Sequence, residues 1–491
     1  MSLFLVAIIF LVNNSNVNAQ MDLPNPPANL ETISAGSFVI PMDTINQAIV
    51  PAGDAPFNLK AYGLINKFLQ NGIPVKWAIR SGKVKDAIDF SANASRIFPT
   101  TLPAANVDFI AGPFIVPDTV LPCGLTTHLI IQDFGNSVAV FQLQQNVVVD
   151  IRYRLEHRPK IAVFNNGGNQ RIHMKILDAA GIPDYIVLSA AQISSLADCF
   201  TFASEPHANP KQVTQQMVNG IMQFVQGGGN FLAQCNAVNS YESLGLFHTT
   251  TGINILGLGN DQIVNNYVNH DMAASQINGN IFPNRFGTCE RWAIDPSSAW
   301  RSYYFPMVSN PGIDTIVFAA AHLIAPTAIG GNVYFLGGHD YGEANFGGPG
   351  GPVADLSDLL GINGMRYYLN AALIPSFNSN AAWANAGPDM TLNCGDTVSL
   401  GCSQTGPLNA TYSWSPSTGL SCVTCTNPIA QPGVTTTYVV TVGTSCNATD
   451  TVTITAKPTR VPPRLSKIRS LKKPSTAGVP HTSTICSSRC G

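Results

Sequence analysis

The sequence is poor in charge and has no long apolar run, and both absences limit what the protein can be. Only 11% of its 491 residues are charged, while 45% are hydrophobic. No uninterrupted apolar stretch reaches the ~18 residues that a membrane-spanning helix needs, so we expect no transmembrane segment. The chain before Lys457 holds 18 basic and 28 acidic residues and forms no basic stripe. This balance argues against a nucleic-acid partner.

Motifs for cofactors and metal ions are also missing. The glycine-rich residues 347–351 lack the following Lys-Ser or Lys-Thr of a phosphate-binding loop. His173 and His270 stand apart, without metal-ligand spacing. Cys422 and Cys425 form the one CxxC, and because no second CxxC or His pair accompanies it, a local disulfide is the better interpretation. We therefore predict no cofactor and no metal.

Both ends of the chain differ from its body. Residues 2–12 are an apolar core too short to span a bilayer, and Val17-Asn18-Ala19 forms a small-residue cleavage site, so residues 1–19 are predicted to be a signal peptide. Residues 457–491 carry eight Lys or Arg and no acid, which predicts a disordered basic tail. We expect a secreted or cell-surface protein, and crowded cysteines near the C-terminus suit that oxidising environment.

Strands and helices are predicted to alternate over the first 375 residues. An N-terminal α/β region spans 36–157, followed by a second α/β domain over 158–375 and a polar linker at 376–383. Parallel strands with crossover helices are expected in both regions. In the first, the patterns predict a helix at 58–70 and strands at 37–40, 75–79, 109–112, 128–131 and 147–151.

The most informative segment lies in the second domain. A predicted helix at 215–225 leads through glycines 227–229 into a short apolar strand at 230–233, and Cys235 follows the strand. A side chain at such a turn projects over the carboxyl end of the sheet. A second strand at 332–336 ends just before His339. This layout predicts a nucleophile and its base.

Candidate site residues follow from this layout. Cys235, His339 and Glu343 are the candidate nucleophile, base and orienting acid, and Asn165, Gly167, Asn236 and Asp340 are candidates for substrate or oxyanion contacts. Each has an ordinary alternative. Cys235 can be a buried structural thiol, His339 a hydrogen-bonded loop histidine, Glu343 a solvated carboxylate, and the loop at 165–169 a plain turn.

Residues 158–374 resemble the class I glutamine amidotransferase-like domains, a superfamily that includes trehalose-utilisation-like proteins. The resemblance rests on the strands at 161–164 and 185–188, on Phe224-Val225-Gln226-Gly227-Gly228-Gly229-Asn230-Phe231-Leu232-Ala233-Gln234-Cys235, and on the strand that ends before His339. It implies a flavodoxin-like parallel sheet, with Cys235 as nucleophile and His339 as its base. The acid does not transfer, because Tyr341 stands two residues after His339, and Ala237 replaces a usual glycine.

Residues 384–456 resemble the immunoglobulin-like or PKD-like repeats of secreted Bacteroidetes surface proteins. The matching segments are Asn385-Ala386-Gly387-Pro388-Asp389, Tyr412-Ser413-Trp414-Ser415-Pro416, Gly419-Leu420-Ser421-Cys422, Thr435-Thr436-Thr437-Tyr438 and Ala448-Thr449-Asp450-Thr451-Val452-Thr453. The resemblance implies an all-β Ig-like sandwich that presents or tethers the rest of the chain. Short alternating strands separated by Gly, Pro and Asn turns predict the same architecture.

Two functions remain open from the sequence. In the first, the α/β region binds an extracellular small molecule or glycan, with cell-surface components as further partners, and the Ig-like module presents it. In the second, the protein is a Cys-His hydrolase acting on an amide or ester, with Cys235 as nucleophile and His339 as base. The reactivity of Cys235 separates the two.

Overall fold

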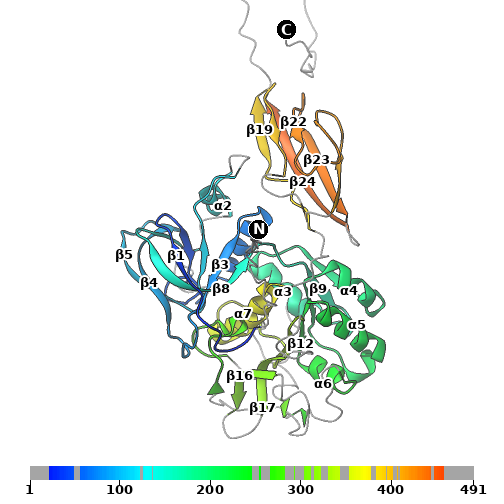
Figure 1. Cartoon of the computed structure of the whole chain (residues 1–491). Helices are drawn as coiled ribbons and strands as arrows, with labels where there is room; N and C mark the ends of the chain where they lie inside the picture. The colour runs from blue at the N-terminus through cyan, green and yellow to red at the C-terminus, as the bar shows by residue number, and fades with distance from the viewer. Residues whose placement is uncertain are drawn as a thin grey trace, which may run out of the picture.

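The structure is a computed structural model of the whole chain (Figure 1). It describes residues 22–48, 56–121, 125–134, 137–245, 254–255, 266–281, 292–293, 304–310, 315–321, 330–342, 353–376, 383–393, 395–401, 406, 410–443 and 447–457. The predicted signal peptide and nearly all of the basic tail lie outside these residues, as does most of the predicted linker. None of the described helices is both long and apolar enough to cross a membrane.

The N-terminal region is built on one curled, eight-stranded sheet (Figure 1). Its order is β1-β8-β3-β6-β2-β7-β4-β5, and every pairing is antiparallel. The strands are β1 (Leu30–Ile33), β2 (Phe38–Ile40), β3 (Val75–Ala78), β4 (Ile88–Phe98), β5 (Ala105–Ile110), β6 (Phe114–Val116), β7 (Val140–Leu143) and β8 (Val147–Leu155). The prediction of parallel strands is wrong here. The link between the neighbours β4 and β5 is too short for a crossover helix, and the apolar pattern of a strand does not encode its direction.

Two helices accompany this sheet, α1 (Lys60–Gln70) and α2 (Thr127–Phe134). The helix predicted at 58–70 is confirmed, but the strand predicted at 128–131 is wrong because those residues lie in α2. A short apolar run such as His128-Leu129-Ile130-Ile131 fits either element by periodicity alone. Helix α1 joins the two regions: a Cβ on Gly63 would stand 2.1 Å from the carbonyl oxygen of Ala180. Only glycine allows the two backbones to approach this closely.

The second region contains a ten-stranded mixed sheet. Five neighbouring strands, in the order β10-β9-β11-β12-β18, are parallel, as predicted, and β17 pairs antiparallel with β18. The strands of this sheet are β9 (Ile161–Phe164), β10 (Tyr185–Leu188), β11 (Phe202–Glu205), β12 (Asn230–Gln234), β13 (Asn254–Ile255), β14 (Asn266–Tyr267), β15 (Trp292–Ala293), β16 (Tyr304–Asn310), β17 (Thr315–Ala321) and β18 (Val333–Leu336).

Helices cover both faces of the parallel strands, and the alternation of side chains along β9 shows how. Ile161 and Val163 join a core shared with α1, α3 and α7, whereas Ala162 and Phe164 join a second core with α4, α5 and α6. A strand buried on both faces is a continuous apolar run, which is why 161–164 was recognisable in the sequence. The helical elements here are α3 (Arg171–Ala180), α4 (Leu196–Cys199), α5 (Gln215–Gln226), α6 (Asn236–Glu242), α7 (Leu359–Leu373), and the 3₁₀ turns η1 (Ala190–Ser195), η2 (Pro210–Gln212) and η3 (Ala273–Ser275).

The C-terminal module forms two small sheets. The larger one is mixed, in the order β19-β24-β23-β21, and the smaller one pairs β20 with β22. Their strands are β19 (Met390–Asn393), β20 (Val398–Ser399), β21 (Thr411–Ser415), β22 (Ile429–Ala430), β23 (Thr436–Gly443) and β24 (Asn447–Lys457). Trp414 lies in the core between them, and Cys422 is paired with Cys425 as the sequence predicted. The ring of Trp383 stacks on that of His157 at 4.9 Å, which connects the module to the body.

Candidate active site

Cys235 occupies a strained turn between β12 and α6. Its backbone has φ 53° and ψ −132°, a conformation that a residue with a side chain adopts at a cost of ~1–3 kcal/mol. The strain is held by the surrounding sheet, because the amide of Cys235 donates to the carbonyl of Leu336 on β18 at 3.0 Å. The side chain is a fully buried thiol outside any disulfide. A strained cysteine at the carboxyl end of a central parallel strand is the geometry of a nucleophile turn.

The thiol lies beside two imidazoles. The Sγ of Cys235 is 3.4 Å from Nδ1 of His207, and the ring of His207 meets that of His339 edge to face, with centroids 4.8 Å apart. The side-chain donor atoms of the three residues all lie within 4.8 Å of one another. They follow β11, β12 and β18, which are neighbours in the sheet. Parallel strands bring their carboxyl ends to one edge, so three distant segments converge here.

A buried chain of hydrogen bonds connects the His339 loop to β12, α3 and β11. Gln234, the last residue of β12, donates to the carbonyl of His339 at 2.9 Å, and its Oε1 is 2.9 Å from Nε2 of His173 on α3. An amide oxygen only accepts, so His173 carries its proton on Nε2, and Nδ1 accepts from the hydroxyl of Ser204 at 2.9 Å. Burial lowers the pKa of His173 to about 3, so this imidazole stays neutral. The chain therefore fixes the distance between β12 and the loop that carries His339.

The loop after β9 reaches the same edge of the sheet. A Cβ on Gly167 would stand 2.3 Å from the carbonyl oxygen of His207, so the two backbones touch there. Asn166 donates to Oε2 of Glu205, the last residue of β11. Desolvation raises the pKa of Glu205 to about 8, and its Oε1 has no hydrogen-bond partner among the described residues. A protonated carboxyl group thus lies buried two residues before His207.

The other predicted site residues have separate positions. Asp340 is buried and forms an ion pair with Lys175 of α3. Asn236 opens α6 and donates to Oδ1 of Asn209 at 2.8 Å, and the side chain of Asn165 is exposed. Glu343 lies outside the described residues. Of the seven candidates, Cys235 and His339 belong to the cluster. Gly167 lies against the backbone of His207, and Asn236 follows Cys235 in the chain.

His207 is the functional candidate that sequence reasoning missed. It stands in Glu205-Pro206-His207-Ala208-Asn209, a loop without a motif. The available signal was positional, because His207 comes two residues after the apolar strand β11. That strand lies between β9 and β12 only in the folded sheet. A histidine so close to the end of a central parallel strand belongs among the candidates for the site edge.

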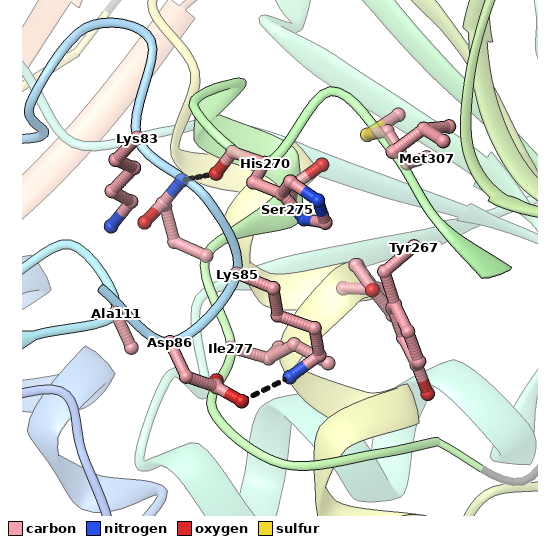
Figure 2. Close-up of a pocket in the computed structure, with 12 residues that line it drawn as sticks. Lys83, Lys85, Asp86, Ala111, Tyr267, His270, Ser275, Ile277 and Met307 are labelled. Atoms are coloured by element: carbon pink, nitrogen blue, oxygen red, sulfur yellow. Dashed lines mark hydrogen bonds and ion pairs between the residues drawn. The ribbon is translucent and has the colours of Figure 1, made fainter. Parts of the chain in front are cut away.

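A small cavity lies away from this cluster (Figure 2). It opens between the loop at 82–87 and the segment around η3, and Lys85 lies over the ring of Tyr267 with its Nζ 4.9 Å from the ring centroid. Lys85 also pairs with Asp86 at 2.7 Å. The charged side chains of Lys85 and Asp86 in its wall are thus already paired with each other, and the rest of the lining includes apolar residues such as Ala111, Ile277 and Met307.

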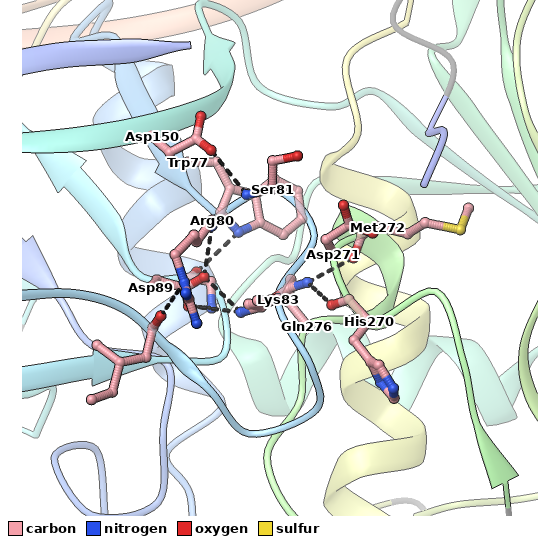
Figure 3. A network of polar contacts seen from close by, with 12 residues as sticks. Trp77, Arg80, Ser81, Lys83, Asp89, Asp150, His270, Asp271, Met272 and Gln276 are labelled. Carbon is pink, nitrogen blue, oxygen red and sulfur yellow. Dashed lines mark hydrogen bonds and ion pairs between the residues drawn. The ribbon is translucent and has the colours of Figure 1, made fainter. Parts of the chain in front are cut away.

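Next to the cavity, a buried polar network joins the N-terminal sheet to the η3 segment (Figure 3). Lys83 and Asp89 pair at 2.6 Å, and burial lowers the pKa of Lys83 although Asp89 opposes the shift. The carboxylate of Asp271 accepts from the amide of Gly82 at 2.9 Å. These bonds satisfy buried polar groups between two parts of the chain, which is a structural role.

Comparisons with known proteins assign no family. No protein-family model matches the chain, and no curated protein matches it. A search of solved structures finds a nucleoside hydrolase-related hypothetical protein from Saccharophagus degradans, described as associated with carbohydrate metabolism. That protein is 10% identical, and the match covers 61% of this chain and all of the other at a TM-score of 0.15. A likeness at this level supports neither a shared fold nor a shared function.

Proposed function

We propose that the protein is a secreted or cell-surface cysteine hydrolase that cleaves an amide or ester. Residues 158–375 are the amidotransferase-like catalytic domain, and the Ig-like module at 384–456 tethers or spaces it. The observation that carries the proposal is the contact between the Sγ of Cys235 and Nδ1 of His207 at 3.4 Å, made at a strained turn above the parallel strands. Nucleophile and base within hydrogen-bond reach are the minimum for thiol catalysis.

The proposed reaction uses groups that the chain supplies. His207 takes the proton of the Cys235 thiol, and the thiolate attacks the carbonyl carbon of the substrate. The imidazolium returns the proton to the leaving amine or alcohol as the carbon–nitrogen or carbon–oxygen bond breaks, leaving a thioester on Cys235. Water, deprotonated by His207, then attacks the thioester, which releases the acid and restores the thiol. Backbone amides near Asn236 and Gly167 are the proposed oxyanion donors.

His339 has a supporting part in this proposal. Its ring packs edge to face against the ring of His207, and its backbone carbonyl accepts a hydrogen bond from Gln234. We infer that it fixes the orientation of the base, His207. Loss of His339 should slow the reaction less than loss of His207, although the sequence pattern favoured His339 as the base.

Iodoacetamide labelling of the folded, non-reduced protein from about pH 5 to 9 tests the proposal. Peptide mapping reports the labelling rate of Cys235, with His207→Ala and His339→Ala as variants and His270→Ala as a matched control outside the cluster. We expect labelling of the native protein to persist well below the ordinary thiol pKa of about 8.5. In His207→Ala the pH profile should return toward that value, and His270→Ala should match the native protein.

A second measurement covers the buried position of Cys235. Acetylation by p-nitrophenyl acetate should place one acetyl group on Cys235 in the native protein and none in Cys235→Ser. If native Cys235 neither alkylates nor acylates, while the unfolded chain does both, the hydrolase proposal is wrong. The non-catalytic alternative, binding of an extracellular small molecule or glycan, would then be the function to pursue.

A further inference from the structure

The cluster at the carboxyl edge of the sheet has the composition of a metal site. It offers one thiolate and two imidazole donors, and the three donor atoms lie within 4.8 Å of one another. We propose that Cys235, His207 and His339 bind a late first-row transition-metal ion, with Zn²⁺ as the expected occupant. This proposal goes beyond the thiol chemistry and does not require it. The sequence contained no metal-ligand spacing, since the three residues come from three separate strand ends.

The geometry fits a tetrahedral ion with little adjustment. With a zinc–sulfur distance of ~2.3 Å and zinc–nitrogen distances of ~2.0 Å, neighbouring donors in a tetrahedral site lie about 3.5 Å apart. The Cys235 Sγ to His207 Nδ1 distance of 3.4 Å already meets that value. His339 needs a movement on the order of 1 Å, which rotation of its half-buried side chain supplies. Three protein ligands leave a fourth position for water or a substrate atom, as in catalytic rather than structural zinc sites.

The ligand types select the ion. Sulfur and imidazole nitrogen suit Zn²⁺ and copper, whereas Ca²⁺ and Mg²⁺ require oxygen donors. Zn²⁺ has no geometric preference of its own and accepts the angles that the strand ends impose. Trigonal coordination by two His and one Cys with a weak axial ligand would instead indicate copper. The experiment below therefore includes both ions.

The surroundings hold the ligands in place before any ion arrives. Cys235 is fully buried, its backbone amide donates a hydrogen bond to the carbonyl of Leu336, and the backbone of His207 lies against Gly167. The loop of His339 is held by Gln234. Preorganised ligands lower the cost of binding, so a Zn²⁺ ion should bind without large rearrangement. Because the ion shares a lone pair of the Cys235 thiolate and occupies the imidazole nitrogen with which His207 would take up a proton, Zn²⁺ should inhibit the proposed thiol-dependent hydrolysis.

Metal binding is tested on the full chain, reduced and stripped with a chelator. Titrations with Zn²⁺ and with copper, each against a chromophoric chelator, should give one Zn²⁺ per chain in the native protein. Co²⁺ should produce a thiolate-to-cobalt charge-transfer band. Cys235→Ser should lose the band and weaken Zn²⁺ binding by more than the ~10–100-fold typical of changes outside the ligand set. His207→Ala and His339→Ala should weaken it similarly, and His270→Ala should bind as the native protein does.

The outcomes separate this proposal from the hydrolase. Absence of stoichiometric Zn²⁺ binding to native protein, or binding that Cys235→Ser leaves unchanged, would overturn the site. Copper binding without zinc binding would overturn zinc as the occupant. The Co²⁺ spectrum of native protein keeps the test decisive even where a variant fails to fold. Labelling of Cys235 is measured in the presence of chelator, so a thiol that is unreactive there counts against the hydrolase alone. A reactive thiol in a protein that does not bind Zn²⁺ in the titration counts against the metal site alone.

Discussion

Acidification should destabilise the second α/β domain through His173. The imidazole is fully buried, packs on the ring of Tyr368 at 4.3 Å and has its pKa lowered to about 3. In the unfolded chain its pKa is about 6.5. Below pH 6.5 the imidazole of His173 binds a proton in the unfolded state but stays neutral in the folded state until the pH approaches 3. The contribution of His173 to stability is therefore complete above pH 6.5 and is lost as the pH falls toward 3.

The size of the effect follows from the difference between the two pKa values. Each pH unit between about 6.5 and 3 removes ~1.4 kcal/mol, so the loss at pH 5 relative to pH 7.5 is ~2 kcal/mol. Glu205 titrates in the opposite sense, since its raised pKa makes the folded state bind the extra proton. The stability of native protein alone thus mixes two terms. His173→Gln separates them, because the amide can pair with Gln234 and Ser204 but does not titrate in this range.

The measurement is urea unfolding of native protein and His173→Gln at about pH 7.5 and pH 5. Hydrogen exchange measured on peptides from β9, β11 and β12 reports the unfolding of this sheet separately from that of the C-terminal module. The free energy of unfolding of native protein, relative to that of the variant, should fall by ~2 kcal/mol between the two conditions. Parallel stability changes in the two proteins would show that His173 is not held neutral in the fold, and the reasoning about its tautomer would be wrong.

Three further predictions concern buried ionisable groups. Arg366 is fully buried on α7, and its guanidinium donates to the carbonyls of Met42 and Gln276. Arg366→Met should therefore lower the free energy of unfolding by about 3 kcal/mol, measured by urea denaturation, and Arg366→Lys should recover little of this loss. Glu205→Gln should stabilise the protein by up to ~4 kcal/mol at pH 8 and by almost nothing at pH 4.5. The reason is that the folded protein with Glu205 is destabilised as the pH rises from 4.5 to the raised pKa of this carboxyl group, about 8. A gain that is equal at both pH values would refute this. Removing one partner of the buried Lys175–Asp340 pair should lower the free energy of unfolding by ~3–5 kcal/mol, measured by thermal or urea unfolding. The double variant Lys175→Met with Asp340→Leu should restore most of that free energy. Equal losses in the single and double variants would contradict the pairing.

Local patterns predicted many individual elements. The strand predicted at 161–164 coincides with β9, because a doubly buried strand is a continuous apolar run, and the helix predicted at 215–225 matches α5, because an amphipathic helix repeats every 3.6 residues. The three glycines before β12 were equally informative: Gly228 has φ 100°, and a Cβ on Gly229 would strike the ring of Phe224. Strand direction was beyond such patterns, and the N-terminal sheet proved antiparallel.

The sequence by itself determined that Cys235 follows a short apolar strand, because the glycines, the apolar run and the cysteine are contiguous. It also brought forward His339 by the same reasoning. Only the tertiary structure decided that His207 is the imidazole in contact with the thiol, and that Asp340 faces Lys175 of α3. The physical reason is that the order of strands in the sheet, not the order in the chain, sets which loop ends meet. Two histidines and a cysteine separated by up to 132 positions in the sequence thus become one cluster.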